Sequence, residues 1–160
     1  MKKSLYITII ISLFLLSCNN KPEYEPDRIL EIGKEYPLIK NQDFKINPII
    51  PTIQYPQRCG ILTSEKDLSN LPIQVLDRMP ELQFVDFKHK NVIIVSLISD
   101  EAITRYVPQV RYNAEEEFAN ITMTYYSDGT NVCLAEWFAA FQCSKENISN
   151  FTVSYSIHCE

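Results

Sequence analysis

The spacing of hydrophobic residues changes along the chain and predicts a different element in each stretch. Between residues 64 and 80, apolar side chains recur at helical spacing: Leu68, Leu71, Val75, Leu76 and Met79. The Ser64 hydroxyl is suited to cap the first turn, with Asp67 three residues further on. Pro72 interrupts the run, so we expect two short helical segments or a kink, ended by Pro80.

Later stretches have the patterns of β-strands. Residues 92–98 are apolar at nearly every position and rich in β-branched side chains, which is typical of a central strand covered on both faces. Four further segments have strand character and polar boundaries: 104–112, 118–126, 132–143 and 151–158. Residues 53–62 predict a strand that lies at an edge or carries a bulge, because Pro56 interrupts it. The pattern as a whole predicts an α+β fold: a mostly antiparallel sheet or half-barrel with one helical segment packed on it.

The first fifty residues differ in character from this region. Lys2 and Lys3 precede an apolar run over residues 5–16, which is shorter than the roughly 20 residues of a membrane-spanning helix. A polar, proline-bearing stretch follows. We therefore interpret residues 1–17 as an export signal, 18–51 as a polar tether that lends at most a short strand, and 52–160 as a single globular domain.

The end of the signal, Leu15-Leu16-Ser17-Cys18, resembles the bacterial lipobox. The resemblance implies that the Cys18 thiol receives a diacylglyceryl group, that the signal is cut before it, and that the new amine is acylated. Several acyl chains on one residue satisfy the requirement for stable anchoring in a bilayer. The alternative is an ordinary secretory signal that leaves Cys18 as a thiol, and both interpretations export the chain.

Residues after Cys18 resemble sorting signals. Asn19 resembles the residue that releases lipoproteins to the outer membrane, and the acidic residues Glu23, Glu25 and Asp27 resemble a surface-export signal of Bacteroidota lipoproteins. A plain solvated tether is the alternative for the acidic stretch. The expected location is the bacterial cell envelope, anchored by lipid at the outer membrane, on its periplasmic or surface face.

The net charge of the chain indicates which classes of partner it is not expected to bind. The formal charge is -5, and removal of Lys2 and Lys3 with the signal makes it -7. An acidic chain without a basic patch is not expected to bind nucleic acid. The lipid bilayer, through Cys18, and another envelope protein are the partners we expect.

The cysteine count predicts disulfides. With Cys18 acylated, four cysteines remain for an oxidising compartment, which predicts two disulfides in one of three connectivities. Cys133 and Cys143 fall on one face of a single long strand, about 33 Å apart, and so are not expected to pair with each other. If residues 144–150 close a hairpin, Cys159 lies within two positions of Cys133. We therefore predict Cys133 with Cys159, and Cys59 with Cys143.

Signatures of catalysis are weak. The three glycines form neither a phosphate-binding loop nor a nucleophile elbow, and His89 and His158 have no metal-ligand spacing around them. We predict no cofactor, no metal and no catalytic residue. The enzymatic alternative is a hydrolase built on dispersed carboxylates, which would need two facing acidic groups with a shifted pKa.

The nine tyrosines suggest a binding surface, because an aromatic ring with a polar tip suits peptides and sugars. Tyr126 is expected to point outward, opposite Tyr125. Tyr106 and Tyr126 are therefore the candidate ligand-binding residues, with ordinary packing as the alternative.

Residues 60–68, the segment Phe84-Val85-Asp86-Phe87-Lys88 and the strand over residues 91–96 resemble the opening of the protease-complex B-like domain family. The resemblance spans about residues 59–99 and implies a strand, a short helix, an Asp-Phe turn and an apolar strand. The chain differs after Ser99, where the family's glycine-rich segment is missing. Together with the anchor, the resemblance favours a non-enzymatic protein-binding or accessory subunit. A small-ligand or glycan-binding lipoprotein is the alternative. The first of these predicts an exposed apolar or aromatic patch.

Overall fold

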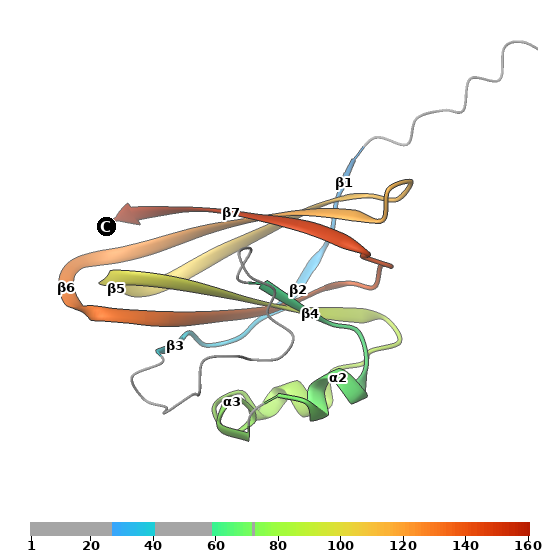
Figure 1. The fold of residues 1–160 in the computed structure, drawn as a ribbon, viewed down its shortest axis with the longest axis horizontal. Helices are drawn as coiled ribbons and strands as arrows, with labels where there is room; N and C mark the ends of the chain where they lie inside the picture. Colours follow the sequence, from blue (N-terminus) through green and yellow to red (C-terminus); the bar gives the residue numbers. More distant parts are fainter. Residues whose placement is uncertain (1–26, 41–58, 72) are drawn as a thin grey trace, which may run out of the picture.

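A computed structural model describes residues 27–40, 59–71 and 73–160, apart from the side chains of Gln74 and Cys133. Its elements, in chain order, are β1 (Arg28–Ile29), β2 (Ile32–Glu35), β3 (Ile39–Lys40), β4 (Cys59–Leu62), α2 (Glu65–Ser69), α3 (Ile73–Arg78), the 3-10 helix η2 (Pro80–Phe84), β5 (Lys90–Asn113), β6 (Phe118–Ser144) and β7 (Asn150–Cys159). The seven strands belong to one sheet, and the short helices lie together on one side of it (Figure 1). An α+β fold dominated by a sheet is therefore confirmed.

Two very long strands, β5 and β6, pair along their lengths and bend back over themselves (Figure 1). The bend lies where the register shifts: between Ser99 and Arg105 of β5 the chain advances six residues, while β6 uses nine between Tyr126 and Ala135. The extra residues of β6 include Gly129, whose φ of 74° is costly for other residues. The bend divides the hairpin into a lower arm (residues 90–99 and 135–144) and an upper arm (residues 105–113 and 118–126).

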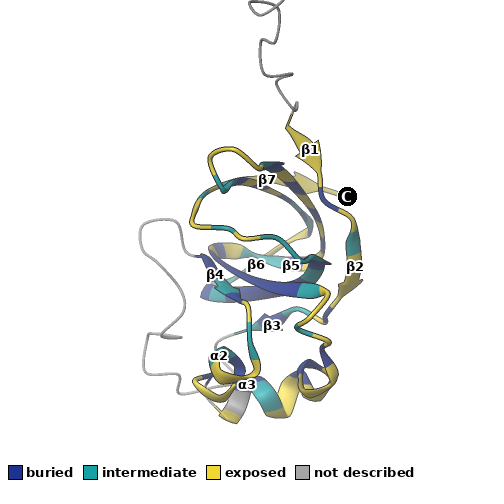
Figure 2. Cartoon of the chain, turned by 90° about the vertical axis from the view of Figure 1, so that its right-hand side faces the viewer, coloured by how far each residue is buried: buried dark blue, intermediate teal, exposed yellow. Residues whose placement is uncertain are grey.

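The two arms form two stacked layers with an apolar core between them (Figure 2). Ile93, Val95 and Leu97 of the lower arm share this core with Ile121 and Met123 of the upper arm, and all five are at most 2% exposed. Alternation along the strands points every second side chain into the core.

The short helices form a third layer beneath the lower arm (Figures 1 and 2). Their apolar residues pack against Val92, Ile94 and Phe138 in a second core: Leu68, Leu71, Val75, Met79 and Leu82. Residues 92–97 are consequently buried on both faces, as the sequence predicts, whereas Ile98 lies beyond the helices and is 41% exposed.

The helical region has the cap and the interruption that its sequence predicts. Ser64 caps α2 by accepting a hydrogen bond from the backbone N–H of Asp67. The Asp67 carboxylate in turn accepts hydrogen bonds from the backbone N–H of Thr63 and the hydroxyl of Ser64. Two short helices, α2 and α3, lie on either side of residue 72, so the expected interruption is confirmed. Pro80 begins η2 after α3 has ended.

Residues 28–40, which the sequence assigns to the tether, belong to the folded domain. β1 pairs with the upper arm of β5, and β2 and β3 pair with the lower arm of β6. Leu30, Tyr36 and Ile39 are buried. This part of the chain crosses from one layer to the other and closes one side of the sandwich. Residues 18–26 and 41–51, which are also part of the predicted tether, lie outside the described residues.

The direction of the last strand, β7, differs from the predicted topology. β7 pairs with the upper arm of β6 in parallel, with Phe118 opposite Asn150 and Ser127 opposite Cys159. Residues 145–149 therefore carry the chain from the lower layer to the upper one and do not close a hairpin. The sheet is mixed, because this parallel pair accompanies antiparallel ones.

Candidate functional site

The free edge of β7 is the feature of the fold most suited to binding. β7 is ten residues long and pairs along its whole length with β6 without a bulge. Among the described residues, no strand pairs with its other edge. An unpaired edge presents backbone donors and acceptors in a row, which is a template for the addition of another strand.

Two hydrogen bonds at the ends of β7 show which backbone groups are available. The N–H of Asn150 donates to the Glu117 carbonyl at 3.3 Å, and the N–H of Glu160 donates to the Ser127 carbonyl at 2.9 Å. Backbone groups of alternate residues in a strand point to opposite sides. The even-numbered residues therefore bond to β6, and the odd-numbered residues direct their N–H and C=O groups to the free edge: Phe151, Val153, Tyr155, Ile157 and Cys159.

Side chains of the same odd-numbered residues add an apolar surface to this edge. Tyr155 and Ile157 are 60% and 37% exposed, although their neighbours in the same rows of β6, Met123 and Tyr125, are fully buried. Phe151 and Val153 pack partly against the core between the layers. The inner face of β7 is thus covered at its beginning and uncovered toward its end.

The usual protections of a sheet edge are missing from β7. Its ten residues include no proline and no Lys, Arg, Asp or Glu, and its register with β6 is continuous. Natural edge strands commonly carry charges, prolines or bulges that prevent further pairing. β4, at the edge of the lower layer, pairs with β5 and is only four residues long, so β7 is the longer of these two described edge strands.

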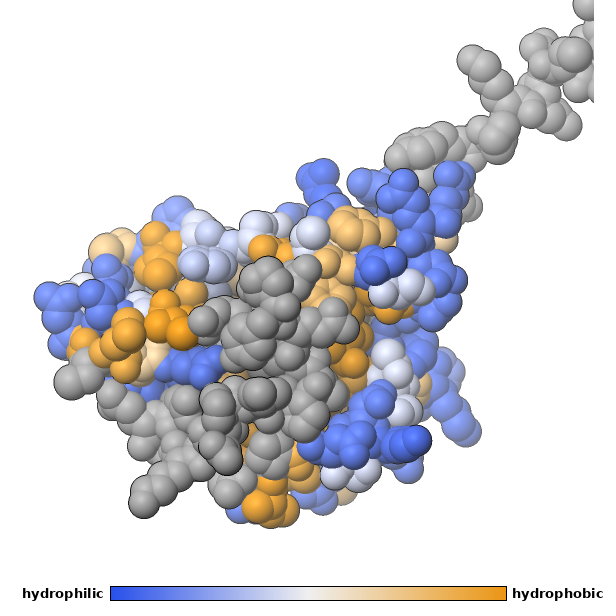
Figure 3. All heavy atoms as spheres, in the orientation of Figure 1, coloured by the Kyte–Doolittle hydropathy of each residue, from blue (hydrophilic) through white to orange (hydrophobic). Residues whose placement is uncertain are grey.

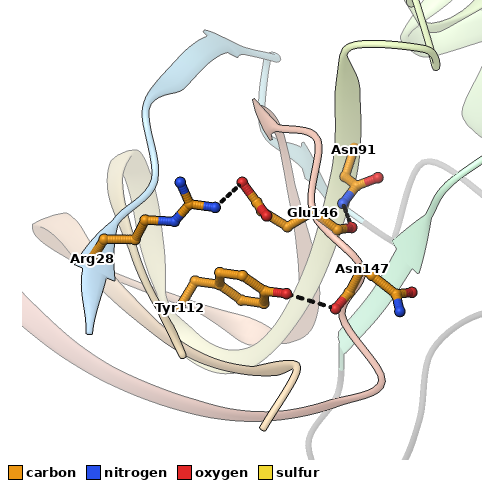
Figure 4. Close-up of polar contacts among 5 residues, drawn as sticks. All are labelled: Arg28, Asn91, Tyr112, Glu146 and Asn147. Atoms are coloured by element: carbon orange, nitrogen blue, oxygen red, sulfur yellow. Dashed lines mark hydrogen bonds and ion pairs between the residues drawn. The ribbon is translucent and has the colours of Figure 1, made fainter. Parts of the chain in front are cut away.

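The loop over residues 145–149 fixes where β7 begins (Figure 4). Glu146 accepts a hydrogen bond from Arg28 at 2.5 Å through its carboxylate and one from Asn91 at 2.8 Å through its backbone carbonyl. Tyr112 donates its hydroxyl to the carbonyl of Asn147 at 2.9 Å. These contacts join β1, both arms of β5 and the loop, so the loop is held across one end of the sandwich.

The turn between the two strands of the upper arm holds the same loop from the other side. Glu117, with a positive φ of 48°, accepts hydrogen bonds from the side chains of Asn147 and Ser149 and from the backbone of Ser149. The sequence suggests dispersed carboxylates as an enzymatic alternative. For Glu117, a structural function in positioning β7 accounts for the observed contacts.

The two candidate tyrosines lie in different environments. Tyr126 points outward, opposite the buried Tyr125, as the sequence predicts. Tyr106 does not reach the surface: it is 6% exposed, and its hydroxyl accepts a hydrogen bond from the backbone N–H of Tyr36. The carbonyls of Tyr36 and Ala140 both lie within hydrogen-bond distance of the same hydroxyl and share its single proton. The expectation that Tyr106 lies on a binding surface is wrong, because its strand directs it between the layers.

The Tyr126 ring already has neighbours. The Arg105 guanidinium lies 3.5 Å from the ring centroid, and the His158 ring lies 5.8 Å from it. Arg105 also forms an ion pair with Glu160. A sugar ring stacking on Tyr126 would have to avoid or displace these neighbours. Arg105 also lines a cavity of about 200 Å³, together with Glu35, Leu38 and Tyr106.

The described cysteines form no disulfide, so the predicted pair Cys59 with Cys143 is wrong. Cys59 aligns with Val95 and Cys143 with Asn91, on opposite sides of β5 and four positions apart. Four positions correspond to about 13 Å along a strand, beyond the reach of a disulfide.

The predicted pair Cys133 with Cys159 is wrong for another reason. Cys159 is free and exposed, and it lies opposite Ser127 because β7 runs parallel to β6. Cys133 comes six residues after Ser127 along β6, beyond the end of β7, and its side chain lies outside the described part of the structure. Direction of pairing, which the sequence left undetermined, therefore separates the two cysteines.

The thiols of Cys59 and Cys143 are buried, and burial opposes their ionisation. Burial raises the pKa of both Cys59 and Cys143, the latter to about 12. Both are therefore protonated at neutral pH, where the thiolate would be the nucleophilic form.

Acidic and histidine side chains in the described part of the chain lie in different environments. Burial raises the pKa of Glu35, whereas the pKa of Asp86 is lowered by hydrogen bonds from His89 and Lys88. Asp86 and Glu65 border an open hollow beneath β4, with Lys66 and Lys88 beside them. No group of three or more His, Cys, Asp or Glu side chains within the described ranges is arranged to hold a metal ion.

Comparisons with known proteins found no relative of this chain. No family model, no curated protein and no solved structure matches it. None of the described helices has the length and apolar character needed to cross a bilayer. Cys18, the expected site of lipidation, lies outside the described residues.

The sequence pattern predicts the strand that forms β7 but not its free edge. The edge depends on the direction in which the strand is added, which alternation alone does not specify. The absence of charge and proline over residues 150–159 is the signal that could have indicated an unprotected edge.

Proposed function

We propose that this chain is a lipid-anchored envelope protein and a non-enzymatic accessory subunit, whose domain binds another protein by accepting an extended strand along β7. The observation that carries the proposal is the uncharged edge of β7, which no other strand of the described ranges pairs with, together with the exposure of Tyr155 and Ile157 beside it. Backbone hydrogen bonds give affinity in this mode of recognition, and the exposed side chains give selectivity.

The surface elsewhere is compatible with protein binding. Large apolar side chains that are exposed also occur on the helical layer and near the bend, including Phe84 at 85% and Leu134 at 70%. Figure 3 shows apolar surface on the helical layer, at the bottom of the view, and at the end of the molecule where the long hairpin bends. These smaller surfaces would extend an interface that begins at β7.

The predicted tether supports an envelope partner. Nine residues separate Cys18 from Arg28, and an extended chain of that length spans about 30–35 Å. If Cys18 is acylated, the domain stays within that distance of the bilayer. A partner strand would then come from a protein at the same membrane surface.

Photocrosslinking in the full-length chain tests the binding site. A photoreactive phenylalanine analogue replaces Ile157 on the edge, and the control carries it at Gln109, which is exposed on β5. Crosslinks are expected from position 157 and not from position 109. Tyr155→Pro should reduce them about tenfold, because proline lacks the N–H directed to the free edge, whereas Tyr155→Thr retains that N–H and should leave them in place.

Crosslinks that are equally strong at both positions, or that survive Tyr155→Pro, would contradict strand addition at β7. The anchor has its own test. Labelling of cells with a fatty-acid analogue should mark the wild-type protein and not Cys18→Ala; equal labelling of the two would exclude Cys18 as the lipidation site.

The second candidate function is binding of a small ligand or glycan. The cavity beside Arg105 favours it, because Tyr106 lines this cavity and Arg105 connects it to Tyr126. A glycan and small-molecule screen would have to give a ligand whose binding is lost in Arg105→Ala. Retained binding in that variant would place the ligand elsewhere.

A further inference from the structure

The sequence of β7 contains no feature that would prevent two copies of this strand from pairing edge to edge. Two identical strands pair without conflict only if the same-face residues that meet are compatible and no like charges face each other. β7 carries no Lys, Arg, Asp or Glu, so two copies of it meet without charge repulsion. Prolines and bulges, which also prevent self-pairing, are missing from it as well.

One antiparallel register uses every available backbone group. The odd-numbered residues from 151 to 159 face the free edge, and Tyr155 is the middle one of these five residues. With a two-fold axis at Tyr155, each Tyr155 exchanges hydrogen bonds with its own counterpart, and Val153 meets Ile157 of the other copy. Phe151 meets Cys159 in the same way, so no free N–H between residues 151 and 159 lacks an acceptor.

The side chains agree with this register on both faces. On the inner face, Val153 meets Ile157 and Tyr155 meets Tyr155, so apolar surface covers apolar surface. On the outer face, Ser154 meets Ser156 and Thr152 meets His158, which are small or polar and exposed. The exposed fractions of Tyr155 and Ile157, 60% and 37%, would both fall on pairing.

We infer that the strand bound at this edge is β7 of a second copy of the chain, paired antiparallel about a two-fold axis at Tyr155. This inference rests on the proposed function, since it names the partner of the same edge. The two upper layers then form one continuous sheet. Because a two-fold interface uses the same surface on both copies, the assembly closes as a dimer and does not extend into a filament.

A charge exchange at the axis tests the inference in the full-length chain. Two differently tagged copies are expressed together, and their co-purification from the envelope is measured. Two Tyr155→Lys copies, or two Tyr155→Glu copies, place like charges opposite each other, and co-purification should fall about fivefold or more. Tyr155→Lys with Tyr155→Glu should restore it, because only this combination places opposite charges at the axis.

Thermal unfolding of each variant serves as the control, since position 155 is largely exposed and the charges should leave the fold intact. Matched variants Gln109→Lys and Gln109→Glu, on an exposed position of β5 away from the edge, should not alter co-purification. Co-purification that is unaffected by like charges at position 155, or that is not restored by the opposite pair, would overturn the inference.

Cysteine pairs test the register itself. In a background with Cys133→Ser and Cys159→Ser, copies carrying Ser154→Cys are mixed with copies carrying Ser156→Cys and oxidised in the envelope. The mixture should give a covalent dimer and each variant alone should give much less, because residue 154 faces residue 156 of the other copy. Equal crosslinking of Ser154→Cys with itself would overturn the register.

The photocrosslinking experiment separates this inference from the proposed function. A crosslink from position 157 to a different envelope protein, with no co-purification of two tagged copies, would overturn self-pairing and leave strand addition intact. No crosslink to any chain would contradict both.

Discussion

The two arms of the β5–β6 hairpin are built from the same two strands, yet they are buried in different ways. In the lower arm every residue from Asn91 to Leu97 is buried, because the upper layer covers one face and the helices cover the other. In the upper arm, buried residues such as Val110 and Tyr112 alternate with exposed ones such as Gln109 and Arg111. The number of covering layers, more than strand length or pairing, determines which positions must be apolar.

The two arms also differ in how their sheet edges are covered. Neighbouring strands and helices cover the lower arm over residues 91–97, whereas the upper arm ends in β7, whose outer edge is paired with no other described strand. Stability is therefore expected to reside mainly in the lower arm, and binding at the border of the upper one.

The largest expected effect comes from removing the same side-chain atoms in the two layers. Ile93→Ala should lower the free energy of unfolding by about 3–4 kcal/mol, because Ile93 is fully buried between the layers. Ile157→Ala makes the same chemical change on the edge of the upper layer, where the side chain is 37% exposed, and should cost less than about 1 kcal/mol. Urea denaturation of both variants measures the difference, and equal losses would contradict the contrast between the layers.

Two buried tyrosines of the upper arm test which contacts connect the two layers. The Tyr106 hydroxyl bonds to Tyr36 and to Ala140 in the lower arm, whereas the Tyr125 hydroxyl is buried without a hydrogen-bond partner among the described residues. Tyr106→Phe should destabilise by about 1–2 kcal/mol, and Tyr125→Phe should be neutral or stabilise by up to about 1 kcal/mol. Thermal unfolding compares the two, and a larger loss from Tyr125→Phe would reverse our assignment of the contact between layers.

The helical cover of the lower arm should depend on its cap and on pH. Ser64→Ala should cost about 1 kcal/mol, because it removes the acceptor for the Asp67 N–H. Although burial acts in the opposite direction, hydrogen bonds from Thr63 and Ser64 lower the pKa of Asp67. A lowered pKa stabilises the fold above the pKa of the unfolded chain, about 4, and this contribution is lost as the pH falls. Asp67→Asn should therefore weaken the loss of stability on acidification, and an unchanged acid profile would argue against this contribution.

The smallest effect in energy concerns single amides of β7. The N–H groups of Thr152, Ser154 and Ser156 bond to β6 and should exchange with solvent slowly. Those of Val153 and Tyr155 face the free edge and should exchange faster in the monomer. Amide exchange measured by NMR at low and high protein concentration should show the alternation at low concentration, and its loss at high concentration if β7 pairs. Uniform exchange along β7 in the monomer would contradict the assigned orientation.

Much of the fold could be predicted from short stretches of the sequence. The cap at Ser64, the helices on either side of residue 72 and the doubly covered strand depend on neighbouring residues or on one apolar run, and all three are observed. Alternation likewise places Tyr125 inside and Tyr126 outside. These features follow from local propensity and periodicity, which a single sequence contains.

The features that the sequence does not predict depend on distant parts of the chain. The parallel direction of β7 is determined by the loop that Arg28, Asn91 and Glu117 hold, and the pairing of β2 with β6 brings Ile32 opposite Cys143. The burial of Tyr106 could not be inferred from its own strand, because another layer covers it. The candidate site depends on the same distant contacts, since an edge is free only once the order of the strands is known.

The position of β1 and β2 has a consequence for the order in which the sheet forms. Ile32 is more than a hundred residues from its partner Cys143, so β2 has nothing to pair with until most of the chain has been made. Contacts of such long separation form slowly, because the intervening chain must first be ordered. A chain made from its N-terminus would therefore hold β1 and β2 unpaired until β5 and β6 have followed, and the first strands of the chain would be among the last to join the sheet.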